Sequence, residues 1–260
     1  MRTLRCVAQD LKTLQLRIEL RKPERPNHPV VTILIDGEDV LGDMSGGFIG
    51  FDPADILDSG ALIPTDPPRR VAVYRCSCGE AGCGCVAAVI EEDGDRVRWL
   101  DLRDFTGVYN VPLGDSAPTG GSPHPVTNLQ FDRAQYRGEV ERAAGDRSWE
   151  TDERRTARLL LGSLANNDER FVEQGYWRGW VAPHWNEPGR YHVEFIGPRG
   201  QVVVVLEPVT GTPEDQADQM ARFMLDTPPD KWKLEMQQDW PAEQVRDAIA
   251  ARQAKRRRGA

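Results

Sequence analysis

The stretch RRVAVYRCSCGEAGCGCVAAVIEEDGDRVRWLDLR, residues 69–103, decides the fold class of the first half of this chain. VAVYRC and VAAVIEE are rich in β-branched and small apolar residues, and a segment of glycines and cysteines separates them. The dipeptide Asp93-Gly94 then precedes a third such run. β-branched runs separated by Gly-containing turns are typical of antiparallel hairpins. The sequence therefore predicts a three-stranded meander with the cysteines at its first turn.

The rest of the chain alternates between strand and helix patterns. LQLRIEL (14–20) and VVTILI (30–35) predict two more strands, and FDPADIL (51–57) predicts a short helix capped by Asp52. The second half predicts two helices, a β meander and two more helices, at 131–144, 151–165, 178–208, from Thr212 and from Pro241. Hairpin-connected strands followed by helices favour an α+β fold with antiparallel β meanders.

One segment has the composition of a linker. PLGDSAPTGGSPHP (112–125) is mostly Pro, Gly, Ser and Thr. It predicts a β-rich domain over 1–111 that contains the cysteines and an α+β domain over 126–250. The remaining residues, 251–260, form a basic tail.

Charge and composition restrict the function classes. The formal net charge is −8, and without the five basic residues of the tail the rest of the chain carries −13. Such an acidic body repels nucleic-acid backbone and suits a basic protein partner. The N-terminus has no apolar signal-peptide region, and the apolar runs are too short to span a bilayer. We therefore expect a cytoplasmic protein with no membrane association and with reduced thiols.

The segment CSCGEAGCGC (76–85) holds four of the five cysteines. If strand 71–78 pairs with strand 83–90 through a four-residue loop, then Cys76 lies opposite Cys85 and Cys78 lies opposite Cys83. Residues two apart on a strand share a face, so all four sulfurs would project from one face of the hairpin.

Three chemistries fit that predicted arrangement. The first is structural zinc on Cys76, Cys78, Cys83 and Cys85, with no open position for catalysis because four thiolates complete a tetrahedral shell. The second is a pair of cross-strand disulfides, and the third is a set of unmetallated or redox-sensing thiols. A reducing compartment favours zinc, which is the predicted cofactor.

FDPADIL and the 69–103 stretch together resemble a module of uncharacterised proteins from high-GC bacteria. The shared pattern is C-x-C-G-x-x-G-C-G followed by a strand, a turn and a Trp-containing strand. The resemblance covers about residues 50–105 and implies no particular activity. In that family the positions matching Cys76, Cys78 and Cys83 recur, while the position of Cys85 varies.

No familiar catalytic motif is present. The chain contains no His-Glu-x-x-His, Gly-x-Ser-x-Gly or Walker-type glycine loop, and it has four histidines. His184 and His192 flank an Asn-Glu-Pro-Gly turn. We expect His184 to face Tyr191, which would leave the two histidines on opposite sheet faces; a register change of one residue would bring them together.

The sequence therefore predicts a non-enzymatic protein-interaction protein with a structural zinc hairpin, and within that class we consider an immunity or defence-associated protein. Its partner would be a basic protein, bound by the acidic body and by an aromatic surface of Trp177, Trp180, Trp185 and Tyr191. These aromatic residues could instead be packed core. One alternative is a nucleic-acid-associated factor that uses the zinc module and Lys255, Arg256, Arg257 and Arg258. A second alternative is an enzyme with its site near His184 and His192.

Overall fold

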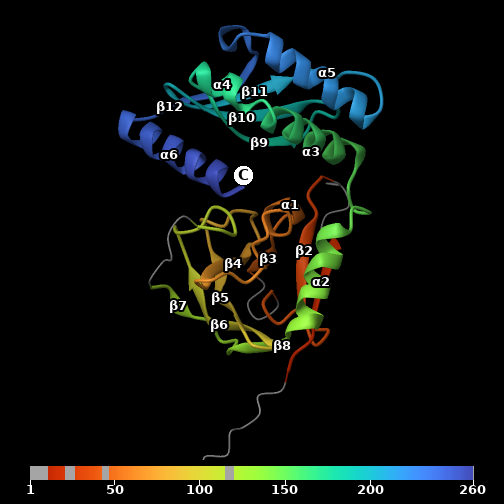
Figure 1. The fold of residues 1–260 in the computed structure, drawn as a ribbon, viewed down its shortest axis with the longest axis vertical. Coiled ribbons are helices and arrows are strands. Elements are labelled where there is room, and N and C mark those ends of the chain that lie inside the picture. Colours follow the sequence, from red (N-terminus) through yellow and green to blue (C-terminus); the bar gives the residue numbers. More distant parts are fainter. Residues whose placement is uncertain (1–10, 21–26, 43–46, 115–119, 260) are drawn as a thin grey trace, which may run out of the picture. The chain divides into compact units, whose positions relative to one another are not determined.

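The computed structural model describes residues 11–20, 27–42, 47–114 and 120–259, with backbone alone from 255 onward. The chain folds as two compact units, Met1–Trp149 and Glu150–Ala260 (Figure 1). All strand pairs in the described sheets are antiparallel, and helices accompany the strands in each unit. The predicted α+β class is therefore confirmed.

The first unit is built on the predicted meander. Its sheet has the order β3-β4-β5-β6-β7, with β8 also paired to β6. The strands are β3 Phe48–Gly50, β4 Arg69–Cys76, β5 Cys85–Asp93, β6 Arg96–Phe105, β7 Ser122–Pro123 and β8 Leu129–Asp132. The turn between β5 and β6 contains Gly94 with φ +63°, a left-handed conformation that glycine adopts without steric cost. The meander and its Asp-Gly turn are confirmed.

A second hairpin of this unit, β1 Leu14–Glu19 with β2 Val30–Ile35, is completed by side chains of a helix. Helix α2 (Arg133–Gly145) packs along β1, and the Gln135 amide both accepts the Leu14 N–H and donates to the Leu14 carbonyl. One turn further, Glu139 accepts the Leu16 N–H at 2.6 Å, and Arg142 donates to the Leu16 carbonyl at 2.7 Å. These side chains form hydrogen bonds with backbone groups on the outer edge of β1, which in a larger sheet would pair with another strand.

The core of the first unit joins the sheet to α2 through aromatic rings. Trp99 makes edge contacts with Phe131 and Tyr136, at ring centroid distances of 5.7 and 6.5 Å. The buried Tyr136 hydroxyl accepts from Trp99 Nε1 at 3.1 Å and donates to the Leu62 carbonyl at 2.8 Å. Short helix α1 (Pro53–Ile56) begins as predicted, since Asp52 accepts the Ala54 N–H at 2.9 Å.

The second unit is a four-stranded sheet of order β12-β11-β10-β9. Its elements are α3 Asp152–Ala165, α4 Asp168–Glu173, β9 Trp177–Pro183, β10 Tyr191–Gly197, β11 Gly200–Leu206, α5 Pro213–Asp226, the 3-10 turn η1 Pro229–Lys231, β12 Leu234–Asp239 and α6 Ala242–Gly259. Tyr191, Val193 and Phe195 of β10 share one core with apolar residues of α3 and α5. Because side chains alternate along a strand, His192 and Glu194 lie on the opposite face.

Helix α6 packs on that opposite face. It contacts β9 and β10, and Arg252 donates to the buried Glu194 carboxylate at 2.7 Å and to the Arg178 carbonyl at 3.1 Å. Figure 1 shows α5 and α6 on different sides of the sheet. An ion pair with a buried carboxylate therefore anchors the C-terminal helix.

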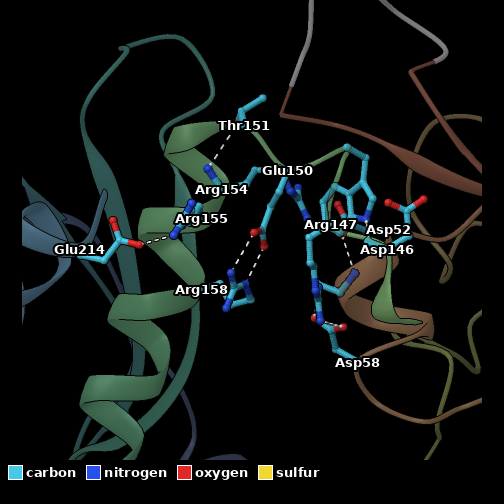
Figure 2. A network of polar contacts seen from close by, with 12 residues as sticks. Asp52, Asp58, Asp146, Arg147, Glu150, Thr151, Arg154, Arg155, Arg158 and Glu214 are labelled. Carbon is cyan, nitrogen blue, oxygen red and sulfur yellow. Dashed lines mark hydrogen bonds and ion pairs between the residues drawn. The ribbon is translucent and has the colours of Figure 1, made fainter. Parts of the chain in front are cut away.

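Local ion pairs tie the end of each unit to its own body (Figure 2). In the first unit, Arg147 donates to both carboxylate oxygens of Asp58, at 2.8 and 3.2 Å. In the second unit, Arg158 pairs in a bidentate way with Glu150, at 2.6 and 2.9 Å, and Arg155 pairs with Glu214 of α5. The unit boundary therefore lies between two locally satisfied polar clusters.

The predicted domain boundary is wrong. Residues 112–125 belong within the first unit, because they include β7, which pairs with β6, and because β8 and α2 follow them and pack on β6 and β1. The linker-like composition marks a long connection inside one unit. The basic end predicted as a tail continues helix α6 to Gly259. None of the described helices is long and apolar enough to cross a membrane.

Candidate metal centre

The turn between β4 and β5 is wider than predicted. Arg75, not Cys76, lies opposite Cys85, and the Cys76 N–H donates to the Gly84 carbonyl at 2.7 Å. The ladder shifts register between Ala72 and Tyr74, so β4 carries an extra residue that changes the pairing near the turn. The loop therefore runs from residue 77 to 84, and the predicted facing pairs Cys76–Cys85 and Cys78–Cys83 are wrong.

The wide turn brings three sulfurs together. One sulfur each from Cys76, Cys78 and Cys83 lies within 4.8 Å of the other two. Cys78 and Cys83 are exposed, and Cys76 is half-buried at the end of its strand. A tetrahedral zinc ion with bonds of about 2.3 Å places its sulfurs about 3.8 Å apart. A small movement of these side chains would thus give three of the four ligands of such a site.

Backbone contacts hold the turn that carries these cysteines. The Ser77 N–H donates to the Gly47 carbonyl, and the Gly79 N–H donates to the Cys76 carbonyl, both at 2.8 Å. Gly79 has φ +99°, which a residue with a side chain would adopt only under strain. The chain therefore reverses immediately after Cys78 and returns Cys83 toward the two earlier cysteines.

Hydrogen bonding within the cluster makes its thiols unequal. The Cys78 backbone N–H, followed by the thiols of Cys78 and Cys83, lowers the pKa of Cys76. Hydrogen bonds to Cys76 and Cys78 raise the pKa of Cys83 to about 11, and the nearby negative charge adds to that effect. The cluster thus favours one thiolate that accepts hydrogen bonds from its neighbours. A cation would remove the repulsion that opposes further deprotonation.

The fourth cysteine does not join the cluster. The Cys85 side chain is buried in the hydrophobic core of the first unit. Burial raises its pKa to about 12, and the Asp104 carboxylate contributes in the same direction. The predicted four-cysteine set is therefore wrong at Cys85, because a one-residue register offset turns that side chain to the other sheet face. Cys76, Cys78, Cys83 and Cys85 are free thiols in this structure, which therefore contains neither of the cross-strand disulfides considered as an alternative.

A second group of candidate ligands lies in the second unit. Tyr191 is opposite Pro183, His192 is opposite Ala182, and the His184 N–H donates to the Arg190 carbonyl at 2.9 Å. This register brings both histidines to one face, with ring centroids 4.5 Å apart, so the expectation of opposite faces is wrong. Burial and the neighbouring His184 lower the pKa of His192, while Glu235 and Glu187 oppose that shift. Sequence patterns missed Glu235, because the polar strand β12 (LEMQQD) gives little strand signal.

The predicted aromatic surface is divided by the sheet. Trp180 and Trp185 are 43% and 67% exposed, and Trp177 is half-buried. Tyr191 is buried against α3 and α5, so it cannot contact a partner and its predicted role is wrong. Side chains alternate along β10, so Tyr191 points to the face covered by α3 and α5, and His192 points to the opposite face.

The basic residues proposed for nucleic acid, Lys255 to Arg258, lie in the last turns of α6, and their side chains are outside the described residues. That role stays a prediction, as does the resemblance of residues 50–105 to the high-GC bacterial module. No family model, curated protein or solved structure matches this chain.

Proposed function

We propose that this protein binds zinc through Cys76, Cys78 and Cys83. The observation that carries the proposal is the convergence of three sulfurs, each within 4.8 Å of the others, on one exposed turn. Thiolates bind Zn²⁺ well, whereas Mg²⁺ and Ca²⁺ prefer oxygen ligands, so a cluster of cysteines favours zinc. The Cys78 N–H beside Cys76 adds the kind of backbone donor that stabilises a metal-bound thiolate.

Three protein thiolates leave one position of a tetrahedral zinc ion open. Cys85 lies in the core, so the fourth ligand comes from outside the four cysteines of this turn. The exposure of Cys78 and Cys83 leaves room for a water molecule or for a side chain of a bound protein. Close, exposed thiols also need a reducing compartment to stay free of disulfides, so we infer a cytoplasmic location.

Metal analysis of the full chain purified under reducing conditions tests this proposal. We expect Cys85→Ala to hold as much zinc as the wild type, and Cys78→Ser and Cys83→Ser each to hold about one zinc per chain less than the wild type. Substitution by Co²⁺ gives a second measurement, because the sulfur-to-cobalt charge-transfer band grows with the number of thiolate ligands. A zinc-free wild type that also fails to bind added Zn²⁺ or Co²⁺ contradicts the proposal. Equal loss of zinc in Cys85→Ala contradicts the ligand set.

A second candidate function is binding of a basic protein through the surface formed by Trp180 and Trp185. Both rings are exposed, and both contact His192. Their centroids lie 6.4 Å (Trp180) and 5.2 Å (Trp185) from the His192 ring. Exposed Trp residues frequently anchor protein interfaces, and the acidic body attracts a positively charged partner. An immunity or defence-associated protein that binds a basic toxin fits these features.

Affinity capture from the native host tests this second function. We expect a specific basic protein to be retained by the wild type and lost from Trp185→Ala. Phe223→Ala is the matched control, since Phe223 is an exposed aromatic residue on α5, on the other side of the sheet. Retention that is the same in both variants contradicts the assignment of this surface.

A further inference from the structure

We propose that His184, His192 and Glu235 form a second metal site, for a divalent transition metal, that is independent of the cysteine cluster. One ligand atom from each of these three residues lies within 4.8 Å of the other two. The site is built entirely within the second unit, from the end of β9, from β10 and from β12. Two imidazoles and one carboxylate suit ions such as Zn²⁺, Ni²⁺ and Fe²⁺, and they suit Mg²⁺ and Ca²⁺ poorly.

The two histidines are buried without complete hydrogen bonding. His184 and His192 are only 6% and 2% exposed, and the Nε2 atom of each ring is buried with no hydrogen-bond partner. Nearly all buried polar atoms in folded proteins have a partner, because an unpaired one has lost its hydrogen bonds to water without replacement. The two rings lie 4.5 Å apart and one ligand atom of each lies within 4.8 Å of the other, so a single metal ion would bind both; the Glu187 carboxylate, 3.7 Å from His184 Nε2, adds negative charge beside that position.

The carboxylate reaches the histidines because of a bulge in β12. Met236 lies opposite Val203 and Leu234 lies opposite Val204, so Glu235 is the extra residue at this register shift. A bulge redirects a side chain that regular pairing would place elsewhere. Among the described residues, none forms a hydrogen bond or an ion pair with the Glu235 side chain. Its exposed carboxylate is therefore available to close onto a metal ion held by the two rings.

Tryptophan side chains form the outer wall of the site. The Trp185 ring stacks on His184 with a centroid distance of 4.8 Å and an interplanar angle of 28°, and it also contacts His192. Trp180 approaches the His192 ring edge-on at 6.4 Å. Aromatic rings around a metal site limit water access and hold the ligand rings in place.

The hydrogen bonds of His184 define what must change when metal binds. Its Nδ1 atom accepts the N–H groups of Asn186 and Glu187, at 3.3 and 3.1 Å. A neutral ring that accepts at Nδ1 carries its proton on Nε2. Coordination through Nε2 therefore requires that proton to move, through solvent, to Nδ1 of the same ring. The two amide contacts are then lost, and the turn after His184 rearranges.

The test uses the full chain with Cys76→Ser, Cys78→Ser and Cys83→Ser, so that zinc at the cysteine cluster does not contribute. Calorimetric titration with Zn²⁺ is expected to show one site per chain that Mg²⁺ does not occupy. In ¹⁵N–¹H spectra the amide signals of Asn186 and Glu187 should shift on saturation. This amide response distinguishes the site from Zn²⁺ adsorbed at surface carboxylates.

Two ligand variants and one control are added to this background. His192→Asn is expected to weaken Zn²⁺ binding by more than about 100-fold, and Glu235→Gln by about 10-fold or more. Glu235 is exposed, so its variant should fold even if His192→Asn does not. His124→Asn, in the other unit, should leave the affinity unchanged. Absence of Zn²⁺ binding overturns the proposal, as does binding that Glu235→Gln and His192→Asn leave intact.

Discussion

Cys85 lies opposite Arg75 in the β4–β5 ladder, and its side chain is buried in the core while the sulfurs of Cys76, Cys78 and Cys83 converge at the turn. Neighbouring cysteines of one hairpin therefore have different chemistry. Cys85 behaves as a small apolar residue, and the other three offer ligands.

The first prediction concerns thiol reactivity. In metal-free native protein we expect the exposed Cys78 to be alkylated by iodoacetamide, and Cys85 to remain unmodified until the chain is unfolded. The Cys78 thiol is open to the reagent, whereas Cys85 is shielded by the core, and burial raises the pKa of its thiol to about 12. Peptide mass spectrometry after timed alkylation measures each site. Modification of Cys85 at the rate of Cys78 would show that the core position is wrong.

The second prediction concerns the anchor of α6. Arg252→Met should lower the free energy of unfolding of the second unit by about 3 kcal/mol, because it leaves the buried Glu194 carboxylate without its positively charged partner and with only the Gln201 amide as a side-chain donor at 3.3 Å among the described residues. The Glu194 side chain is 1% exposed and that of Arg252 is 29% exposed. Chemical denaturation monitored by Trp fluorescence measures the loss.

Arg199→Met is the matched control for this anchor. Arg199 pairs with Asp239 on the surface, where the side chains are 71% and 54% exposed, so we expect a cost of at most about 1 kcal/mol. Equal losses in the two variants would mean that the Glu194 pair does not anchor the helix.

The third prediction concerns Gly179, which lies beside the same ion pair. A Cβ atom at this position would lie 1.6 Å from Glu194 Oε2 and 2.3 Å from an Arg252 guanidinium nitrogen. Gly179→Ala should therefore displace the pair and destabilise the second unit, and its effect should not add fully to that of Arg252→Met. In contrast, Gly138→Ala places a methyl group in open space on α2 and should stabilise by about 0.5–1 kcal/mol. Full additivity of Gly179→Ala and Arg252→Met would contradict this explanation.

The fourth prediction concerns pH. Partial burial acts to raise the pKa of Glu139, but hydrogen bonds from Arg142 and from the Leu16 N–H outweigh it, and the pKa falls below its usual 4.5. A lowered folded-state pKa means that Glu139 contributes its full stabilisation above about pH 4.5 and loses it as the pH falls through the folded-state value. The unfolding free energy of Glu139→Gln should thus change less between pH 5 and pH 3 than that of the wild type.

Urea unfolding at a series of pH values measures this difference. Glu141→Gln on the same helix is the control, since Glu141 is exposed and forms no hydrogen bond or ion pair with β1 among the described residues. A pH dependence identical in wild type and Glu139→Gln would exclude a role of this carboxylate at the β1 edge.

Most elements were predictable because their signals are local. The β-branched runs of β2, β4 and β11, the Asp-Gly turn after β5 and the Asp52 cap of α1 all depend on residues close together in sequence. Strand β12 was missed because its sequence, LEMQQD, is mostly polar and its side chains are exposed. The unit boundary was misplaced because the membership of α2 depends on distant contacts, such as that of Gln135 with Leu14.

By itself, the sequence determined the α+β class, the meanders and the placement of the cysteine-rich segment at the first turn. Only the tertiary structure decided which side chains share a face. A bulge in β4 removed Cys85 from the cysteine cluster, the register of β9 and β10 brought His184 and His192 together, and a bulge in β12 added Glu235. Side chains alternate with a period of two along a strand, so a shift of one residue exchanges the two faces. Such shifts are set by pairing between strands and leave little trace in the local sequence.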